Sequence, residues 1–298
     1  MNDFTTSTVL EVKGLKRHFG KVLAVDGVDL NVIAGEIYGF LGINGAGKTT
    51  TIRSVMGIIA PEAGTIRLVG ETTRRTSVAQ RRRIGYVSQE QNFYPWMTCK
   101  TLGKFVGSFY PTWDAAEFCR LLDVFSIPLD RKVSALSGGM KAKLALALAV
   151  APGPDLLILD EPTAGLDPVA RNEFMEIIVA QSRQHQRTTF FSSHLIDEVE
   201  RCADRIGIIH AGKMMFEGEL SGLRDQVRCV YSPPEMIFEM PSYFESWRQR
   251  ESNGVKQHTF RGTPEQWDAL QVPLQVEVRR LSLEAIFVAC VSAERIMI

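Results

Sequence analysis

The sequence contains few cysteines and carries no net charge. Five of its 298 residues are Cys, and none of them forms a CxxC pair. Neither a zinc site nor a disulfide framework is expected from such spacing, and the cytosol is the natural compartment. Lys plus Arg and Asp plus Glu number 34 each. This balance gives no electrostatic reason to expect nucleic acid as the main partner.

Long apolar segments are absent as well. The longest charge-free runs, residues 37–47 and 144–154, have eleven residues each, which is too short to span a bilayer. The opening MNDFTTSTVLEVKG lacks the basic-then-apolar order of a secretory signal. Hydrophobic residues (45%) and charged residues (23%) have ordinary shares for a globular protein. The length suggests one large domain or two.

The most informative stretch is residues 42–49, GINGAGKT, which matches the phosphate-binding pattern G-x-x-x-x-G-K-[ST]. A strand-like apolar run precedes it and apolar residues at helical spacing follow it. Glycines let backbone N–H groups approach a polyphosphate, and the helix beginning near Lys48 directs more of them at the anion. Lys48 can reach the β- and γ-phosphates, and Thr49 can ligate Mg²⁺. The alternative is a Gly-rich turn that happens to precede a lysine.

Three further features carry possible chemistry. LSGGM at 136–140 opens a helix with bare N–H groups, although a plain helix cap would look the same. The aliphatic run 156–159 ends in Asp160 and Glu161, as a buried parallel strand with acids at its carboxyl end would. Asp160 can hold Mg²⁺ through water, and Glu161 can activate water. His194 follows the strand-like TTFFSS, although a lone His is more often structural.

The remaining segments give a coarse element map. Residues 8–33 predict short strands, and about 95–152 predict helices. The five arginines within 74–83 favour a solvated helix face over a nucleic-acid or lipid patch. Helices are expected over 141–150 and 169–184. In the tail, strands are expected over 226–231, 236–240 and 255–260, and helices over 263–270 and 282–290.

Taken in order, these features resemble the ATP-binding subunit of ABC transporters over residues 8–220. The matching motifs are GINGAGKTT (42–50) for Walker A, Gln89 in GYVSQE for the Q-loop, LSGGM for the signature, LLILDE (156–161) for Walker B, GLD (165–167) for the D-loop and His194 for the switch histidine. Phe19 stands where the family places its adenine-stacking aromatic. Two departures are mild: that aromatic is often Tyr, and the signature often ends in Gln where Met140 stands.

The resemblance implies an α/β fold. A P-loop NTPase core with a parallel sheet, an antiparallel β subdomain and a helical insertion at about 92–152 would occupy residues 1–220. A small α+β accessory domain would occupy 221–298. The implied cofactors are ATP and Mg²⁺.

The resemblance also implies residue roles. ATP would be bound by Phe19, Gly42, Asn44, Gly45, Ala46, Gly47, Lys48, Thr49 and Thr50, the metal by Thr49, Gln89 and Asp160, and catalysis would use Glu161, His194 and Gln89. Ser137, Gly138 and Gly139 would act on the ATP of a partner subunit, which Asp167 would contact. The partner would be a second copy or a paralogous ATPase subunit, paired head to tail.

The implied function is that of an ATP-hydrolysing motor subunit, bound to a separate integral membrane permease at the cytoplasmic face of the membrane. SLEAIF (282–287) resembles exporter subunits. We expect the permease to contact Gln89–Phe109, where Phe93, Tyr94, Trp96 and Met97 cluster, unless these aromatics are core. The alternative is a soluble ABC-type ATPase acting on ribosomes or nucleic acid. The chain has only one cassette, and no sustained heptads lie between Gln89 and Ser137, so we favour the transporter.

Overall fold

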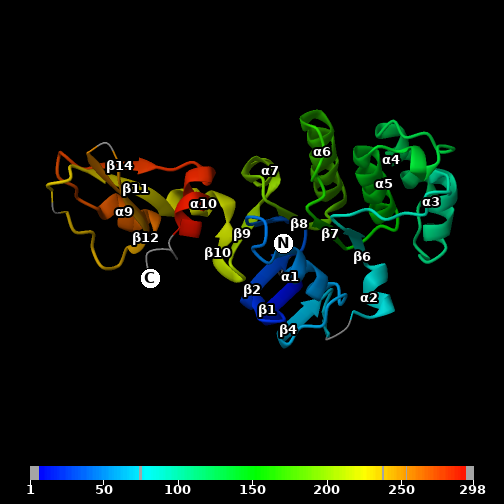
Figure 1. The fold of residues 1–298 in the computed structure, drawn as a ribbon, viewed down its shortest axis with the longest axis horizontal. Coiled ribbons are helices and arrows are strands. Elements are labelled where there is room, and N and C mark those ends of the chain that lie inside the picture. Colours follow the sequence, from blue (N-terminus) through cyan, green and yellow to red (C-terminus); the bar gives the residue numbers. More distant parts are fainter. Residues whose placement is uncertain (1–6, 74–75, 237, 253, 293–298) are drawn as a thin grey trace, which may run out of the picture. The chain divides into compact units, whose positions relative to one another are not determined.

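The computed structural model describes residues 7–73, 76–236, 238–252 and 254–292. Their contacts divide the chain into two compact units (Figure 1). The first comprises residues 1–203 and 209–214, and the second comprises 204–208 and 215–298. The domain boundary expected at residue 220 stays a prediction.

The first unit opens with a four-stranded antiparallel sheet, in the order β2-β1-β4-β5. Its strands are β1 (Thr8–Phe19), β2 (Val22–Ile33), β4 (Ala63–Leu68) and β5 (Glu71–Thr73). The strands expected over 8–33 are confirmed, but β1 and β2 are longer than the short strands expected, with 12 residues each. Register shifts interrupt their pairing four times. Such irregularities break the apolar alternation by which one long strand is normally recognised.

A six-stranded sheet, in the order β10-β9-β3-β8-β7-β6, carries the phosphate loop. Its strands are β3 (Ile37–Leu41), β6 (Ile84–Val87), β7 (Leu156–Asp160), β8 (Thr188–Ser193), β9 (Arg205–His210) and β10 (Lys213–Glu219). Strands β3, β8, β7 and β6 pair in parallel. Every residue of β3, β7 and β8 is buried. The carboxyl ends of these strands therefore meet at one edge, where α/β sheets bind ligands.

Helices fill the rest of the first unit. They are α1 (Lys48–Val55), α2 (Val78–Arg82), α3 (Cys99–Gly107), α4 (Ala115–Val124), α5 (Gly138–Val150), α6 (Pro168–His185) and α7 (Ile196–Cys202), with a 3-10 turn at Val133–Ala135. The insertion is helical, as predicted, and Figure 1 shows α3, α4 and α5 grouped together. Helix α5 begins at Gly138 and not at 141. Arg81 and Arg82 are exposed on α2, whereas Arg74 and Arg75 lie outside the described residues.

The second unit is an α+β arrangement around an antiparallel sheet, in the order β12-β13-β11-β14. Its elements are α8 (Leu220–Gln226), β11 (Val227–Ser232), β12 (Glu245–Ser252), β13 (Val255–Arg261), α9 (Pro264–Ala269), β14 (Glu277–Arg280) and α10 (Leu283–Ser292). Its core gathers Val230, Phe244, Phe260, Trp267 and Val276. The predicted capping box of Thr263 and Gln266 opens α9.

The strand expected over residues 236–240 is wrong. The described part of that segment lies outside the strands. Met236, Phe238 and Met240 pack against the core from a loop, which explains their apolar character. The strand that the sequence did not predict is β12, because its polar sequence ESWRQRES shows no apolar alternation. Among the described residues, no helix combines the length and the hydropathy required to cross a membrane.

Candidate active site

The phosphate loop at the carboxyl end of β3 borders a cavity of about 220 Å³. The cavity is lined by Ala24, Asn44, Gly45, Ala46, Gly47, Lys48, Thr49, Thr50, Gln89 and Glu161. Gly47 has φ 110°, and a Cβ there would lie 2.6 Å from the Ala24 carbonyl oxygen. A Cβ at Gly42 would lie 2.7 Å from the Ile209 carbonyl oxygen. Two of the loop glycines are therefore required by the packing of the loop itself.

Lys48 joins the loop to Glu161, the residue that follows β7. Its side chain is 4% exposed, and its ammonium donates to the carbonyl oxygens of Gly42 (2.7 Å) and Ile43 (3.1 Å). Nζ also lies 2.9 Å from Glu161 Oε1. A buried ammonium needs such partners to offset its lost hydration. A phosphate oxygen entering the cavity would meet a positioned cation.

Asp160, at the end of β7, places a buried carboxylate beside Thr49. Its Oδ1 accepts hydrogen bonds from Thr49 Oγ1 and Ser192 Oγ, each at 3.0 Å. Its Oδ2 is buried and has no hydrogen-bond partner within the described part of the chain. Burial raises the pKa of the carboxyl, and the two hydroxyl donors partly offset that rise. A hydroxyl and a carboxylate oxygen suit Mg²⁺, so these residues fit the metal.

Glu161 stands in a backbone conformation that few side-chain-bearing residues adopt. Its φ is 45°, in the left-handed region. Its N–H donates to Ser192 Oγ at 3.0 Å, and its Oε2 lies 2.7 Å from His194 Nδ1. Burial works to raise the pKa of Glu161, but the hydrogen bonds of Lys48 and His194 outweigh it and lower that pKa. The carboxylate is therefore ionised at neutral pH beside the cavity.

Several of the predicted site residues do not line this cavity. Ser137 caps α5 by accepting from the Met140 N–H at 3.2 Å, and it is exposed together with Gly138. Asp167 caps α6 by accepting from the N–H groups of Val169 and Ala170, each at 3.0 Å. These bonds lower its pKa, the Ala170 bond most, although burial opposes them. The signature and the D-loop carboxylate are thus left facing outward.

Phe19 ends β1 and is 47% exposed. The Arg17 guanidinium lies 5.2 Å from the ring centroid. Phe19 itself does not line the cavity, whereas Ala24, on the paired strand β2, does. The ring is accessible for stacking on a flat ligand that extends beyond the phosphate loop.

Comparisons with known proteins agree with this geometry. Residues 25–164 match the family described as ABC transporter. The chain is 40% identical over 226 residues to the Nod factor export ATP-binding protein I of Paraburkholderia xenovorans, covering 72% of each chain. It is 36% identical over 224 residues to the bacitracin transport ATP-binding protein of Bacillus licheniformis, covering 74% of this chain and 73% of the relative.

A solved structure of an ATP-binding subunit of an ABC transporter aligns with a TM-score of 0.66 and 30% identity, over 73% of this chain and 92% of that one. The chain belongs to the ABC transporter family. It is an ATP-binding cassette of the ATPase class, and the predicted P-loop NTPase fold is confirmed.

The cassette also contains site residues that the sequence alone did not reveal. Ser192 hydrogen-bonds both Asp160 and the backbone of Glu161. Thr163, two residues after Glu161, and Glu198, four residues after His194, are also buried polar residues. The only signal was the polar end of TTFFSS, because hydroxyls on a buried strand require partners. Nothing in the sequence around Glu198 distinguished it from an ordinary helix residue.

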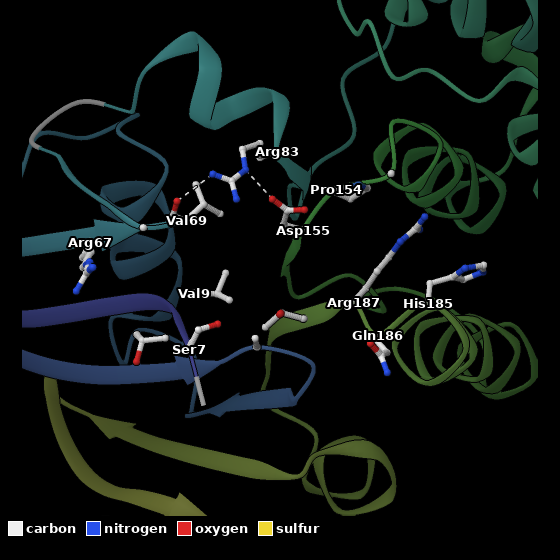
Figure 2. A pocket seen from close by; sticks show the side chains of 15 residues that line it. Ser7, Val9, Arg67, Val69, Arg83, Pro154, Asp155, His185, Gln186 and Arg187 are labelled. Carbon is white, nitrogen blue, oxygen red and sulfur yellow. Dashed lines mark hydrogen bonds and ion pairs between the residues drawn. The ribbon is translucent and has the colours of Figure 1, made fainter. Parts of the chain in front are cut away.

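A larger hollow of about 870 Å³ lies at the opposite ends of the parallel strands of the cassette (Figure 2). Arg83 there donates to Asp155 Oδ2 (2.6 Å) and to the Val69 carbonyl oxygen (3.0 Å). Figure 2 shows the side chains of Arg187 and His185 extending away from the hollow. Arg187 donates to Gln181 Oε1 at 2.6 Å. The charged groups of this hollow do not point toward one common position where a ligand could bind. We therefore do not assign it as the active site, although it is larger than the cavity at the phosphate loop.

Proposed function

We propose that this chain hydrolyses ATP as the motor subunit of an ABC exporter. The observation that carries the proposal is the convergence of Lys48, Asp160, Glu161 and His194 at one edge of a parallel sheet. Lys48 and the loop N–H groups would bind the β- and γ-phosphates. Mg²⁺ held by Thr49, Asp160 and Gln89 would offset the charge of the phosphates.

The residues around the cavity fit hydrolysis of the terminal phosphoanhydride bond. Glu161, held ionised, would accept the proton of a water that attacks the γ-phosphorus, while the bond from that phosphorus to the ADP oxygen breaks. His194, 2.7 Å from Glu161, would donate to the γ-phosphate. The adenine would stack on Phe19.

A head-to-tail dimer would complete the site. Ser137, Gly138 and Gly139 do not line the cavity of their own chain, yet they form a helix start with unpaired N–H groups, which suits an anion. Placed over the cavity of a second copy or of a paralogous subunit, they would cover the γ-phosphate. Asp167 would contact that partner.

An exposed aromatic ladder, defined as Tyr94, Trp96, Phe105 and Phe109, supports a docking surface for the permease. Neighbouring ring centroids along it are 5.2–5.7 Å apart. Trp96 is 66% and Phe109 is 56% exposed. Exposed contiguous aromatics mark interaction sites more often than chance. One relative is named for Nod factor export and another for bacitracin transport. The chain would work peripherally at the cytoplasmic membrane face through that permease.

The docking proposal predicts the outcome of a pull-down. Tagged Glu161→Gln protein is expected to recover a multi-spanning membrane protein from detergent-solubilised membranes of its own host. The double variant Trp96→Ala, Phe109→Ala, made in the same background, is expected to lose most of that recovery while still binding ATP. Truncating an aromatic hot spot at an interface centre costs on the order of 2 kcal/mol or more.

The matched control is Tyr243→Ala, which removes a comparably exposed ring (54%) from the second unit. It should leave the recovery unchanged. Recovery of ribosomes or nucleic acid without any membrane protein would instead support the soluble ATPase and contradict the motor proposal.

A further inference from the structure

Glu198 is a buried carboxylate of α7, four residues beyond His194. The residue is 4% exposed. Its Oε1 accepts a hydrogen bond from Thr163 Oγ1 at 2.6 Å, and its Oε2 accepts one from Ser193 Oγ at 2.7 Å. Arg171 Nε lies 3.4 Å from Oε1. One carboxylate oxygen therefore contacts the loop after β7 and the other contacts the end of β8, and the cation offsets part of the charge.

The two hydroxyl groups belong to the segments that carry the proposed catalytic pair. Thr163 is two residues beyond Glu161, and its carbonyl oxygen accepts from the Leu166 N–H at 3.1 Å, which closes the D-loop turn. Ser193 immediately precedes His194. Its own carbonyl oxygen accepts from the Gly42 N–H at 3.3 Å, which connects it to the phosphate loop.

Arg171 adds a second path to the D-loop. Its Nη2 donates to the Leu166 carbonyl oxygen at 3.3 Å, beside Asp167. Glu198 therefore holds Thr163, just before the D-loop, and Arg171 holds Leu166 within it. A carboxylate suits this place because only an acceptor with two oxygens can receive both hydroxyl protons and still attract the guanidinium.

We propose that Glu198 is a positioning residue that links the D-loop to the turn carrying His194. Movement of the D-loop on partner contact is passed through Thr163 and Glu198 to Ser193, and thereby sets His194 against Glu161. The inference rests on the proposed function, because it concerns the geometry of that same site. A carboxylate that served only the start of α7 would not need to bond Thr163, which lies on another loop.

The test compares Glu198→Gln with the wild-type full chain in ATP hydrolysis. The amide keeps the size of the side chain but loses the charge and one acceptor. A mutation far from the reacting atoms that misplaces a catalytic group by about 1 Å can lower the rate by about 10²-fold. We therefore expect kcat to fall by about 10- to 100-fold. The KM for ATP and the calorimetric affinity for ATP should stay near wild type. A merely structural role would lower affinity and the unfolding midpoint together with kcat.

A double-variant comparison separates action through His194 from other effects. In a His194→Ala background, Glu198→Gln should produce no further loss in single-turnover hydrolysis, because both changes remove one and the same arrangement. An undiminished loss in that background would overturn the proposal. Thr163→Val is a second variant that keeps the buried charge; it should also lower kcat with little change in KM.

Asp197→Asn is the matched control, since Asp197 is the exposed neighbour on the same helix, and it should leave hydrolysis unchanged. A Glu198→Gln enzyme with wild-type kcat, beside an active wild type, would refute this inference alone. A wild-type chain that neither binds nor hydrolyses ATP would refute the proposed function itself.

Discussion

Glu161→Gln is expected to keep ATP binding, to lower kcat by about 10²- to 10⁴-fold and to accumulate an ATP-bound dimer. The amide has the same shape, so the cavity keeps its form. It cannot accept the proton of the attacking water, however, because an amide is not a base at neutral pH. The same change removes the ion pair of Lys48 with Glu161, which leaves Lys48 more available to phosphate.

Two measurements check this expectation. Steady-state hydrolysis gives kcat, and size-exclusion chromatography with and without ATP gives the association state. Glu176→Gln, the same substitution at an exposed position of α6, should behave as wild type in both. A Glu161→Gln chain that hydrolyses ATP normally, or that stays monomeric with ATP, would contradict the role given to Glu161.

Local motifs explain why so much of the site could be predicted from sequence. Residues 42–49 form one contiguous loop whose chemistry depends on glycine at particular positions, and the structure shows tight packing against Gly42 and Gly47. Likewise, four aliphatic residues followed by Asp160 predict a buried strand that ends in acids, and β7 is such a strand. In both cases the pattern and the chemistry occupy the same few residues.

Contacts between distant residues could not be predicted in this way. The bond of Thr49 to Asp160 joins residues 111 positions apart, and the bond of Thr163 to Glu198 joins residues 35 apart. They depend on which strands are neighbours in the sheet, and that order is not written in any one segment. The left-handed backbone of Glu161 is likewise imposed by its surroundings, since propensity alone disfavours it.

The secondary structure of the second unit was mispredicted for a different reason. Strand β12 is predominantly polar, and of its eight residues only Trp247 is buried. The apolar residues Met236, Phe238 and Met240 look like part of a strand in the sequence, yet they pack against the core from a loop. Closely spaced apolar residues indicate burial, and a loop that packs on a core contains them as well as a strand does.

If the dimer is paired head to tail, each site takes its phosphate loop from one chain and its signature from the other. Two different damaging substitutions should then affect different parts of the same site. Lys48→Ala removes the buried cation and is expected to weaken ATP binding by about 10- to 100-fold, as loss of a charged hydrogen bond does. Gly138→Asp places a carboxylate at the signature. A Cβ there meets no atom within 4 Å, and an acid suits the first turn of a helix, so α5 should still form.

Each single variant should be nearly inactive as a homodimer, since both of its sites are damaged. Mixing the two variants should restore hydrolysis well above the sum of their separate rates. In the mixed dimer, the intact phosphate loop of the Gly138→Asp chain faces the intact signature of the Lys48→Ala chain. The other site carries both defects.

The control is a chain that carries both substitutions, mixed with the wild-type chain. That mixed dimer contains the same four altered and unaltered elements, yet each of its two sites pairs a damaged element with an intact one. This mixed dimer should therefore hydrolyse almost no ATP, and the activity of the mixture should come from the wild-type homodimers alone. If each chain instead completes its own site, the first mixture should show no recovery, and the wild-type chain should stay active in the mixed dimer of the second. The outward-facing signature of α5 would then need another explanation.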